Sequence, residues 1–219
     1  MQHKPKFINH EKHKHIITPI TPINLISPIN LIKKNMKTFL QLKGNYKELI
    51  AYQKAECIYD ITYYIAHKYL SKKDRTIDQM IQAARSGKQN IAEGNSAATT
   101  SLETELKLLN VARASLQELL VDYEDYLRVN HLEQWKINSP KAIQTRKVCS
   151  KHNDSAYYRN AITQRNDETI ANIAITLIHQ EDVFLRRLIE TKQENFLKEG
   201  GIREKMTAAR LSYKKQNPH

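Results

Sequence analysis

Turn-forming residues are scarce in this sequence, which contains five glycines and six prolines among its 219 residues. Such a composition argues against a β-sandwich or β-barrel with many tight turns. The two cysteines, Cys57 and Cys149, are too few for a disulfide framework or a zinc site, and they indicate a reducing cytoplasm. No uncharged apolar run reaches the roughly 18 residues that a membrane-spanning helix needs, so we expect no membrane protein.

Helix-forming residues are abundant instead, above all leucine, isoleucine, alanine, lysine, glutamate and glutamine. With 40% hydrophobic residues, the chain can build a core for one domain with appendages, or for two small domains at most. The composition therefore predicts an all-α protein.

The chain is strongly basic, with a net charge of +12, and its charges are segregated. Residues 136–165 hold seven basic residues against Asp154 alone, and residues 1–36 hold six against Glu11. Residues 98–135, in contrast, hold seven acidic residues and three basic ones. This distribution favours anionic partners, nucleic acid before acidic membrane surfaces.

The first 36 residues are predicted to form a disordered leader. Their segment ITPITPINLISPINLI repeats Thr/Ser-Pro-Ile, and proline at this spacing prevents a helix and keeps the backbone extended. The composition changes abruptly at Met36, which makes Met36 an alternative translation start.

The apolar periodicity predicts four helices, over about 45–70, 76–98, 101–130 and 167–198. Thr76–Gln79 and Thr100–Glu103 have the spacing of capping boxes at the starts of the second and third helix. Residues 131–166 lose the periodicity, so we expect a long loop with at most one short helix.

These helices specify an antiparallel, up-down four-helix bundle over residues 37–198. Gly200 and Gly201 end the fourth helix, and a short basic amphipathic helix is predicted over 202–211. The last eight residues are expected to fray. Residues 199–219 thus form a C-terminal appendage to the bundle.

Two of the five glycines, Gly87 and Gly94, fall inside the second helix, where each costs about 1 kcal/mol relative to alanine. Both lie on the apolar stripe with Ala84, so we interpret the three residues as a smooth strip for close helix packing. Gly87-Lys88 superficially resembles a phosphate-binding loop. However, the positions where a Walker motif needs another glycine and a hydroxyl residue hold glutamines.

The first helix is rich in tyrosine: Tyr46, Tyr52, Tyr59, Tyr63, Tyr64 and Tyr69. We interpret these rings as packing residues in helix contacts and in a subunit interface. A base-stacking platform is the alternative. It has less support from the sequence, because such platforms interleave aromatic residues with arginine or lysine on one face.

Four segments carry a family resemblance: QNIAEGNS (89–96), SLETELKLLNVARASLQELLVDYEDYL (101–127), DETIANIAITLIHQ (167–180) and FLKEGGIREKMTAAR (196–210). Together they resemble a bacterial four-helix-bundle family first met as products of intervening sequences in large-subunit ribosomal RNA genes. The resemblance covers about residues 42–211, and the last segment resembles the C-terminal suffix of one branch.

The resemblance implies a homopentamer with a basic surface that binds nucleic acid, and it implies no established enzyme activity. A related branch is the accessory protein of diversity-generating retroelements, which joins a reverse transcriptase.

Other chemistry has weaker support in the sequence. No glutamate has a histidine three residues later, as bundle metal sites require, so we expect no metal or cofactor. Arg146 and His152 have the spacing of a ribonuclease pair that binds phosphate and moves a proton, but both lie in the predicted loop. Arg113 occupies a leucine position of the third helix. We expect a carboxylate such as Glu118 to pair with it, or the arginine to line a channel in an oligomer.

Nucleic-acid binding has the best support, and nine basic residues can supply phosphate contacts: Arg85, Lys88, Lys141, Arg146, Lys147, Lys151, Arg203, Lys205 and Arg210. An oligomer would repeat these contacts and raise the affinity for a polyanion. We therefore expect a cytoplasmic, non-enzymatic oligomer that binds RNA or DNA with little sequence preference. The alternatives are a protein-interaction adaptor for a reverse transcriptase and an Arg/His-type ribonuclease.

Overall fold

A computed structural model describes residues 45–217, and the predicted leader with Met36 lies outside these described residues. The described part of the chain is all-α, which confirms the predicted fold class. Its elements are the 3₁₀-helix η1 (Tyr46–Glu48) and the α-helices α2 (Ile50–Tyr69), α3 (Thr76–Ala97), α4 (Leu102–Val129), α5 (Pro140–Lys151), α6 (Ser155–Ile162), α7 (Asp167–Glu199) and α8 (Ile202–Gln216). Within residues 45–217, no helix has the length and apolar character needed to cross a bilayer.

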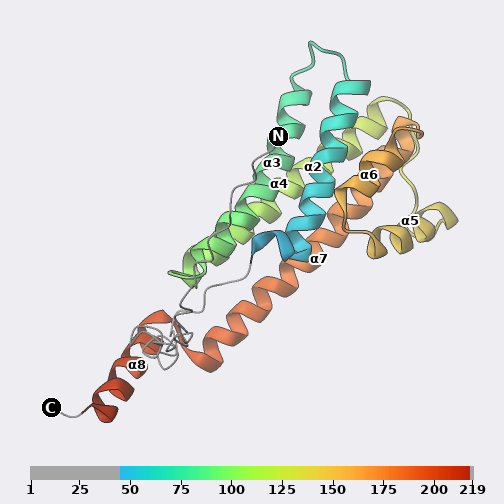
Figure 1. The fold of residues 1–219 in the computed structure, drawn as a ribbon. Coiled ribbons are helices and arrows are strands. Elements are labelled where there is room, and N and C mark those ends of the chain that lie inside the picture. The colour runs from blue at the N-terminus through green and yellow to red at the C-terminus, as the bar shows by residue number, and fades with distance from the viewer. Residues whose placement is uncertain (1–44, 218–219) are drawn as a thin grey trace, which may run out of the picture. The chain divides into compact units, whose positions relative to one another are not determined.

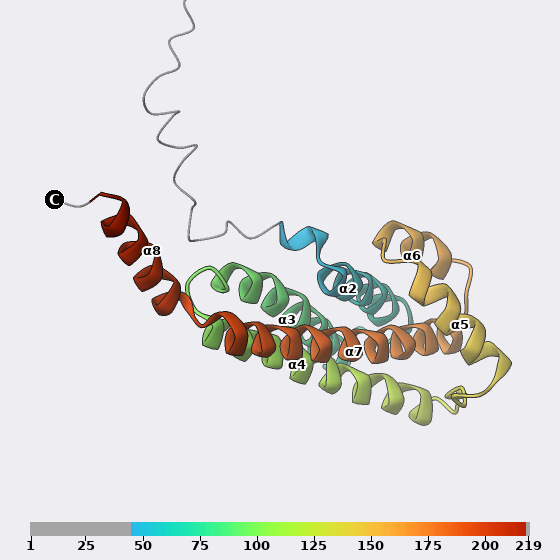
Figure 2. The same ribbon diagram turned by 90° about the horizontal axis from the view of Figure 1, so that it is seen from below.

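Helices α2, α3, α4 and α7 lie side by side as an up-down bundle (Figures 1 and 2). α2 and α4 each pack against both α3 and α7. Lys192 pairs with Glu105 near one end of the α4–α7 contact, and Tyr126 donates to Asp167 near the other end, so these two helices are antiparallel. Leucine, isoleucine and alanine side chains from all four helices form one core.

Both predicted capping boxes are wrong in their details. Asp74 Oδ1, 2.9 Å from the Thr76 backbone N, accepts the hydrogen bond that opens α3. Ser101 caps α4 by accepting from the Thr104 backbone N at 3.1 Å, while Thr100 donates back to the Ala97 carbonyl oxygen at the end of α3. Threonine and serine can serve a helix start or a preceding turn equally well, so the spacing alone did not decide between them.

The predicted long loop over 131–166 is also wrong, because it contains two helices, α5 and α6. Ser139 and Asp154 cap them by accepting from the backbone N atoms of Ala142 and Ala156. α5 packs against α7 and α6 against α2. α5 buries only Ala142 and Cys149, too few residues to produce a recognisable apolar period.

The C-terminal helix is longer than predicted. α8 continues to Gln216, five residues beyond the predicted end at 211, and none of its residues is buried. Gly200 separates it from α7 with φ of 71°, a backbone conformation that favours glycine. α8 therefore presents an amphipathic surface that the rest of residues 45–217 leaves exposed.

Candidate nucleic-acid interface

Helix α5 concentrates positive charge on the outside of the bundle. It contains Lys141, Arg146, Lys147 and Lys151 and no acidic residue. Lys141 Nζ lies 3.9 Å from a carboxylate oxygen of Glu168. The other three form no ion pair with any residue between 45 and 217. Their charges are therefore available to an anionic partner.

Two hydrogen bonds to its backbone tie α5 to the bundle and leave its charged side outward. Lys54 Nζ on α2 donates to the Cys149 carbonyl oxygen at 2.7 Å. Gln180 Nε2 on α7 donates to the Arg146 carbonyl oxygen at 3.1 Å. Lys147 is exposed, as are Lys141 and Lys151, whereas Arg146 is half-buried.

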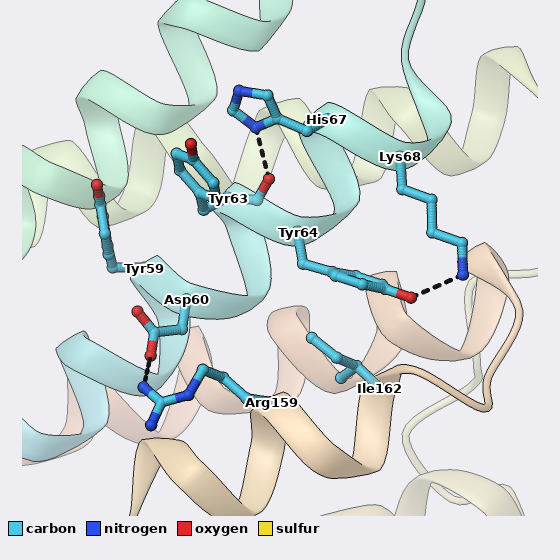
Figure 3. Close-up of a pocket in the computed structure, with 8 residues that line it drawn as sticks. All are labelled: Tyr59, Asp60, Tyr63, Tyr64, His67, Lys68, Arg159 and Ile162. Atoms are coloured by element: carbon cyan, nitrogen blue, oxygen red, sulfur yellow. Dashed lines mark hydrogen bonds and ion pairs between the residues drawn. The ribbon is translucent and has the colours of Figure 1, made fainter.

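A second feature is a groove of about 600 Å³ between α2 and α6, which we call the tyrosine groove (Figure 3). Its lining residues are Tyr59, Asp60, Tyr63, Tyr64, His67, Lys68, Arg159 and Ile162. The volume lies within the range of ordinary ligand sites.

Three rings follow one another along the α2 side of the tyrosine groove (Figure 3). Tyr59, Tyr63 and His67 are spaced four residues apart, so a helix places them on one face. The ring centroids of Tyr59 and Tyr63 are 6.3 Å apart, and those of Tyr63 and His67 are 4.2 Å apart. His67 Nδ1 is 2.8 Å from the Tyr63 carbonyl oxygen, which holds the imidazole ring in this row.

Cations from three helices lie in or beside the tyrosine groove. Lys88 Nζ on α3 lies 4.2 Å from the Tyr59 ring centroid, a cation–π distance. Arg159 Nη1 on α6 bonds Asp60 Oδ2 at 2.7 Å (Figure 3). Lys68 Nζ on α2 donates to the Tyr64 hydroxyl at 2.7 Å, and this hydrogen bond raises the pKa of the Lys68 ammonium. Folding thus adds basic groups from α3 and α6, Lys88 and Arg159, to the tyrosine-rich face of α2.

The nine predicted phosphate-binding residues do not converge on one surface of the chain. Arg85 and Lys88 lie on α3, and four others lie on α5. Arg203, Lys205 and Arg210 lie on α8, at the opposite end of α7 from α5 (Figures 1 and 2). Lys205 is engaged by Glu199 at 2.8 Å.

The small residues of α3 face α4. Ala84, Gly87 and Gly94 are all buried. A Cβ atom on Gly87 would lie 2.8 Å from two side-chain atoms of Leu116, and one on Gly94 would lie 3.5 Å from Leu108 Cβ. Gly87 is thus the point where α4 leaves no space for a side chain.

Two predicted pairings come out differently in the structure. Arg113 binds Asp182 on α7, with Nε 3.0 Å from Oδ1, instead of Glu118. Arg146 lines a groove between α5 and α7, but His152 does not line it and stacks on the Tyr157 ring at 3.8 Å. That separation gives the ribonuclease alternative little support.

Among residues 45–217, no three histidine, cysteine, aspartate or glutamate side chains gather as a metal site would require.

The sequence argument interpreted His67 as a histidine at the edge of an apolar stripe and gave neither it nor Arg159 a binding role. Spacing of Tyr59, Tyr63 and His67 by four residues was the available signal for the row of rings. No sequence signal pointed to Arg159, because its partner Asp60 lies 99 residues away in the chain.

Comparison of the chain with models of protein families, with curated proteins and with solved structures finds no match. The geometry of the residues therefore carries the functional proposal.

Proposed function

We propose that this protein is a non-enzymatic nucleic-acid-binding protein that contacts RNA or DNA phosphates with little sequence preference. Helix α5 carries the proposal, because it has four cations, no acidic residue, and three cations without a carboxylate partner within residues 45–217. Guanidinium and ammonium groups in this state bind phosphates and release the counterions around them. A contact of this kind does not read the base sequence.

The salt dependence of binding tests this mechanism. We expect the logarithm of the association constant to fall linearly with the logarithm of salt concentration, by about 0.7 to 0.9 per phosphate contacted. Changing Lys147 and Lys151 to glutamine should weaken binding. It should also reduce the slope by the amount that corresponds to about two phosphate contacts. Fluorescence anisotropy between roughly 50 and 200 mM salt measures both effects.

The matched control removes the same charge elsewhere. Lys107 and Lys198 are exposed and already paired with Glu103 and Glu194 on their own helices. Changing both to glutamine should leave the slope unchanged. If the salt slope is unchanged when Lys147 and Lys151 are substituted, or falls equally when Lys107 and Lys198 are substituted, α5 does not bind phosphates.

We also propose that the protein assembles with copies of itself, with α8 of one copy seated on α4 of the next. On α8, Met206 and Tyr213 lie seven residues apart and therefore on one face of the helix, and they are 49% and 67% exposed. On α4, Val111 and Val121 are 46% and 55% exposed. Unpaired apolar surfaces of this kind favour an interface.

The charges of the two helices are complementary. α8 carries five basic residues and Glu204, whereas α4 carries six acidic residues and three basic ones. A contact between two different surfaces is heterologous, and it closes into a ring when the rotation between copies allows. In this assembly the α8 cations face carboxylates, and α5 is left to bind nucleic acid.

Light scattering after size exclusion tests the assembly. The protein should elute as an oligomer, and changing Met206 and Tyr213 to glutamate should shift it toward the 25.5 kDa monomer, because two charges cannot be buried against valines. Ile137, which is 72% exposed between α4 and α5, provides the control, and Ile137→Glu should leave the mass unchanged. A wild-type monomer, or equal effects of both substitutions, contradicts this interface.

A further inference from the structure

We propose that the tyrosine groove binds unpaired nucleotides, with bases stacked on its rings and phosphates held by the cations beside them. This inference rests on the proposed nucleic-acid binding and names its substrate class, which is single-stranded RNA or DNA. It assigns a role to a surface that phosphate binding by α5 does not use.

The rings are accessible for stacking. Tyr63, in the middle of the row, is 51% exposed, His67 is also exposed, and Tyr59 is half-buried under Lys88. Bases in a duplex are stacked on one another and present only their edges, so an exposed aromatic face is useful to unpaired bases. Stacking is tolerant of sequence because every base has a π-face.

Cations lie beside the rings and can reach phosphates of a bound strand. Lys88 Nζ lies 4.2 Å from the Tyr59 ring centroid at one end of the row, whereas Lys68 Nζ lies beside the Tyr64 and Tyr69 rings, next to the row. Arg159 Nη1 donates to Asp60 Oδ2 and Ser155 Oγ, yet the Arg159 side chain is 58% exposed. A guanidinium has five N–H donors, so Arg159 can hold Asp60 and a phosphate together.

A nucleic acid fits this groove better than a protein partner does. Of the eight lining residues, Ile162 is the only aliphatic one, and the rest are aromatic or charged. Asp60 is the only acidic group among them, and Arg159 already neutralises it. The groove thus combines stacking surface with a net positive charge, the pattern of single-strand binding sites.

The test compares single-stranded and duplex probes of the same sequence. Tyr63→Leu keeps an apolar side chain and removes the ring. Affinity for fluorescently labelled oligouridine and oligothymidine should fall about 5- to 150-fold, the worth of one stacked base. Affinity for a duplex should stay within a factor of two of wild type, roughly the error of such titrations. Tyr63→Phe retains the ring and should retain single-strand binding.

A second measurement does not depend on the variant folding well. An oligonucleotide carrying 5-iodouracil should crosslink to Tyr59 or Tyr63 of the wild-type protein on irradiation. Mass spectrometry of the crosslinked protein identifies the residue.

The outcomes separate this inference from the proposed function. If Tyr63→Leu leaves single-strand affinity unchanged, or weakens duplex binding equally, the groove does not bind unpaired bases, while α5 phosphate binding stands on its salt slope. If crosslinks fall outside α2, the stacking inference is also overturned. If wild-type protein binds no probe, both proposals fail.

Discussion

Replacing Gly87 with alanine is expected to lower the free energy of unfolding by up to about 2 kcal/mol, although alanine is the better helix former. The added Cβ would lie 2.8 Å from Leu116 Cγ and Cδ2. Leu116 is fully buried in the core, so it has little room to change rotamer. Overpacking costs about 1–3 kcal/mol, and the roughly 1 kcal/mol gained in helix propensity offsets part of it. Urea unfolding followed by circular dichroism measures the difference.

Gly94 is the matched control on the same helix face. A Cβ there meets the Glu105 carbonyl oxygen and Leu108 Cβ at 3.5 Å, which is ordinary van der Waals contact. Gly94→Ala should therefore raise the free energy of unfolding by up to about 1 kcal/mol.

A double-substitution cycle tests the cause directly. Leu116→Ala opens a cavity and should cost about 2–5 kcal/mol. In that background Gly87→Ala should become stabilising, because the new methyl group enters the cavity. If Gly87→Ala destabilises equally in both backgrounds, the contact with Leu116 is not the reason for the glycine.

The four bundle helices were predictable because their apolar stripes repeat over five or more turns. Gly87 could be placed on such a stripe from spacing alone. α5 and α6 were missed because short helices with few buried residues give no readable period. Periodicity therefore finds the helices that make the core and overlooks α5, the short helix whose cations lack carboxylate partners.

Contacts between helices are what the sequence could not supply. A carboxylate five residues away was expected for Arg113, but its partner Asp182 is 69 residues away. The same limit hid the proximity of Lys88 and Arg159 to the α2 tyrosines, since these two residues come from α3 and α6. A single sequence shows the face of each helix and leaves open which other helix covers it.

A buried lysine and glutamate lay outside the sequence predictions for the same reason. Lys54 on α2 and Glu181 on α7 are both completely buried in the core. Lys54 Nζ has the Cys149 carbonyl oxygen as its acceptor, whereas neither carboxylate oxygen of Glu181 has a hydrogen-bond partner within residues 45–217. Burial lowers the pKa of Lys54 and raises the pKa of Glu181 well above its usual value, and the charge of each partly counteracts the shift of the other.

Removing Lys54 alone should destabilise the protein. Lys54→Met leaves the buried Cys149 carbonyl oxygen without its donor, a loss of about 1–3 kcal/mol, and removes the cation that partly counteracts the raised pKa of Glu181. Changing Lys54 to methionine and Glu181 to leucine together should be neutral or stabilising by up to about 4 kcal/mol, because apolar packing replaces two desolvated ionisable groups. If the double variant is as unstable as Lys54→Met, these groups do not act as a pair.

The pH dependence of Glu181→Gln isolates the carboxyl group, because glutamine keeps its shape and does not titrate. With its pKa raised by folding, Glu181 binds a proton in the folded state where unfolded glutamate, with a pKa near 4.5, has lost it. Its contribution to stability is therefore complete below about pH 4.5 and declines as pH rises through the folded pKa. The stability of Glu181→Gln relative to wild type should consequently be lowest in acid and increase toward pH 8, as thermal unfolding of both proteins across this range will measure. Taking the difference between the two proteins cancels the titration of Asp122, whose pKa burial also raises. A difference that is constant with pH would show that Glu181 is already ionised in the folded core.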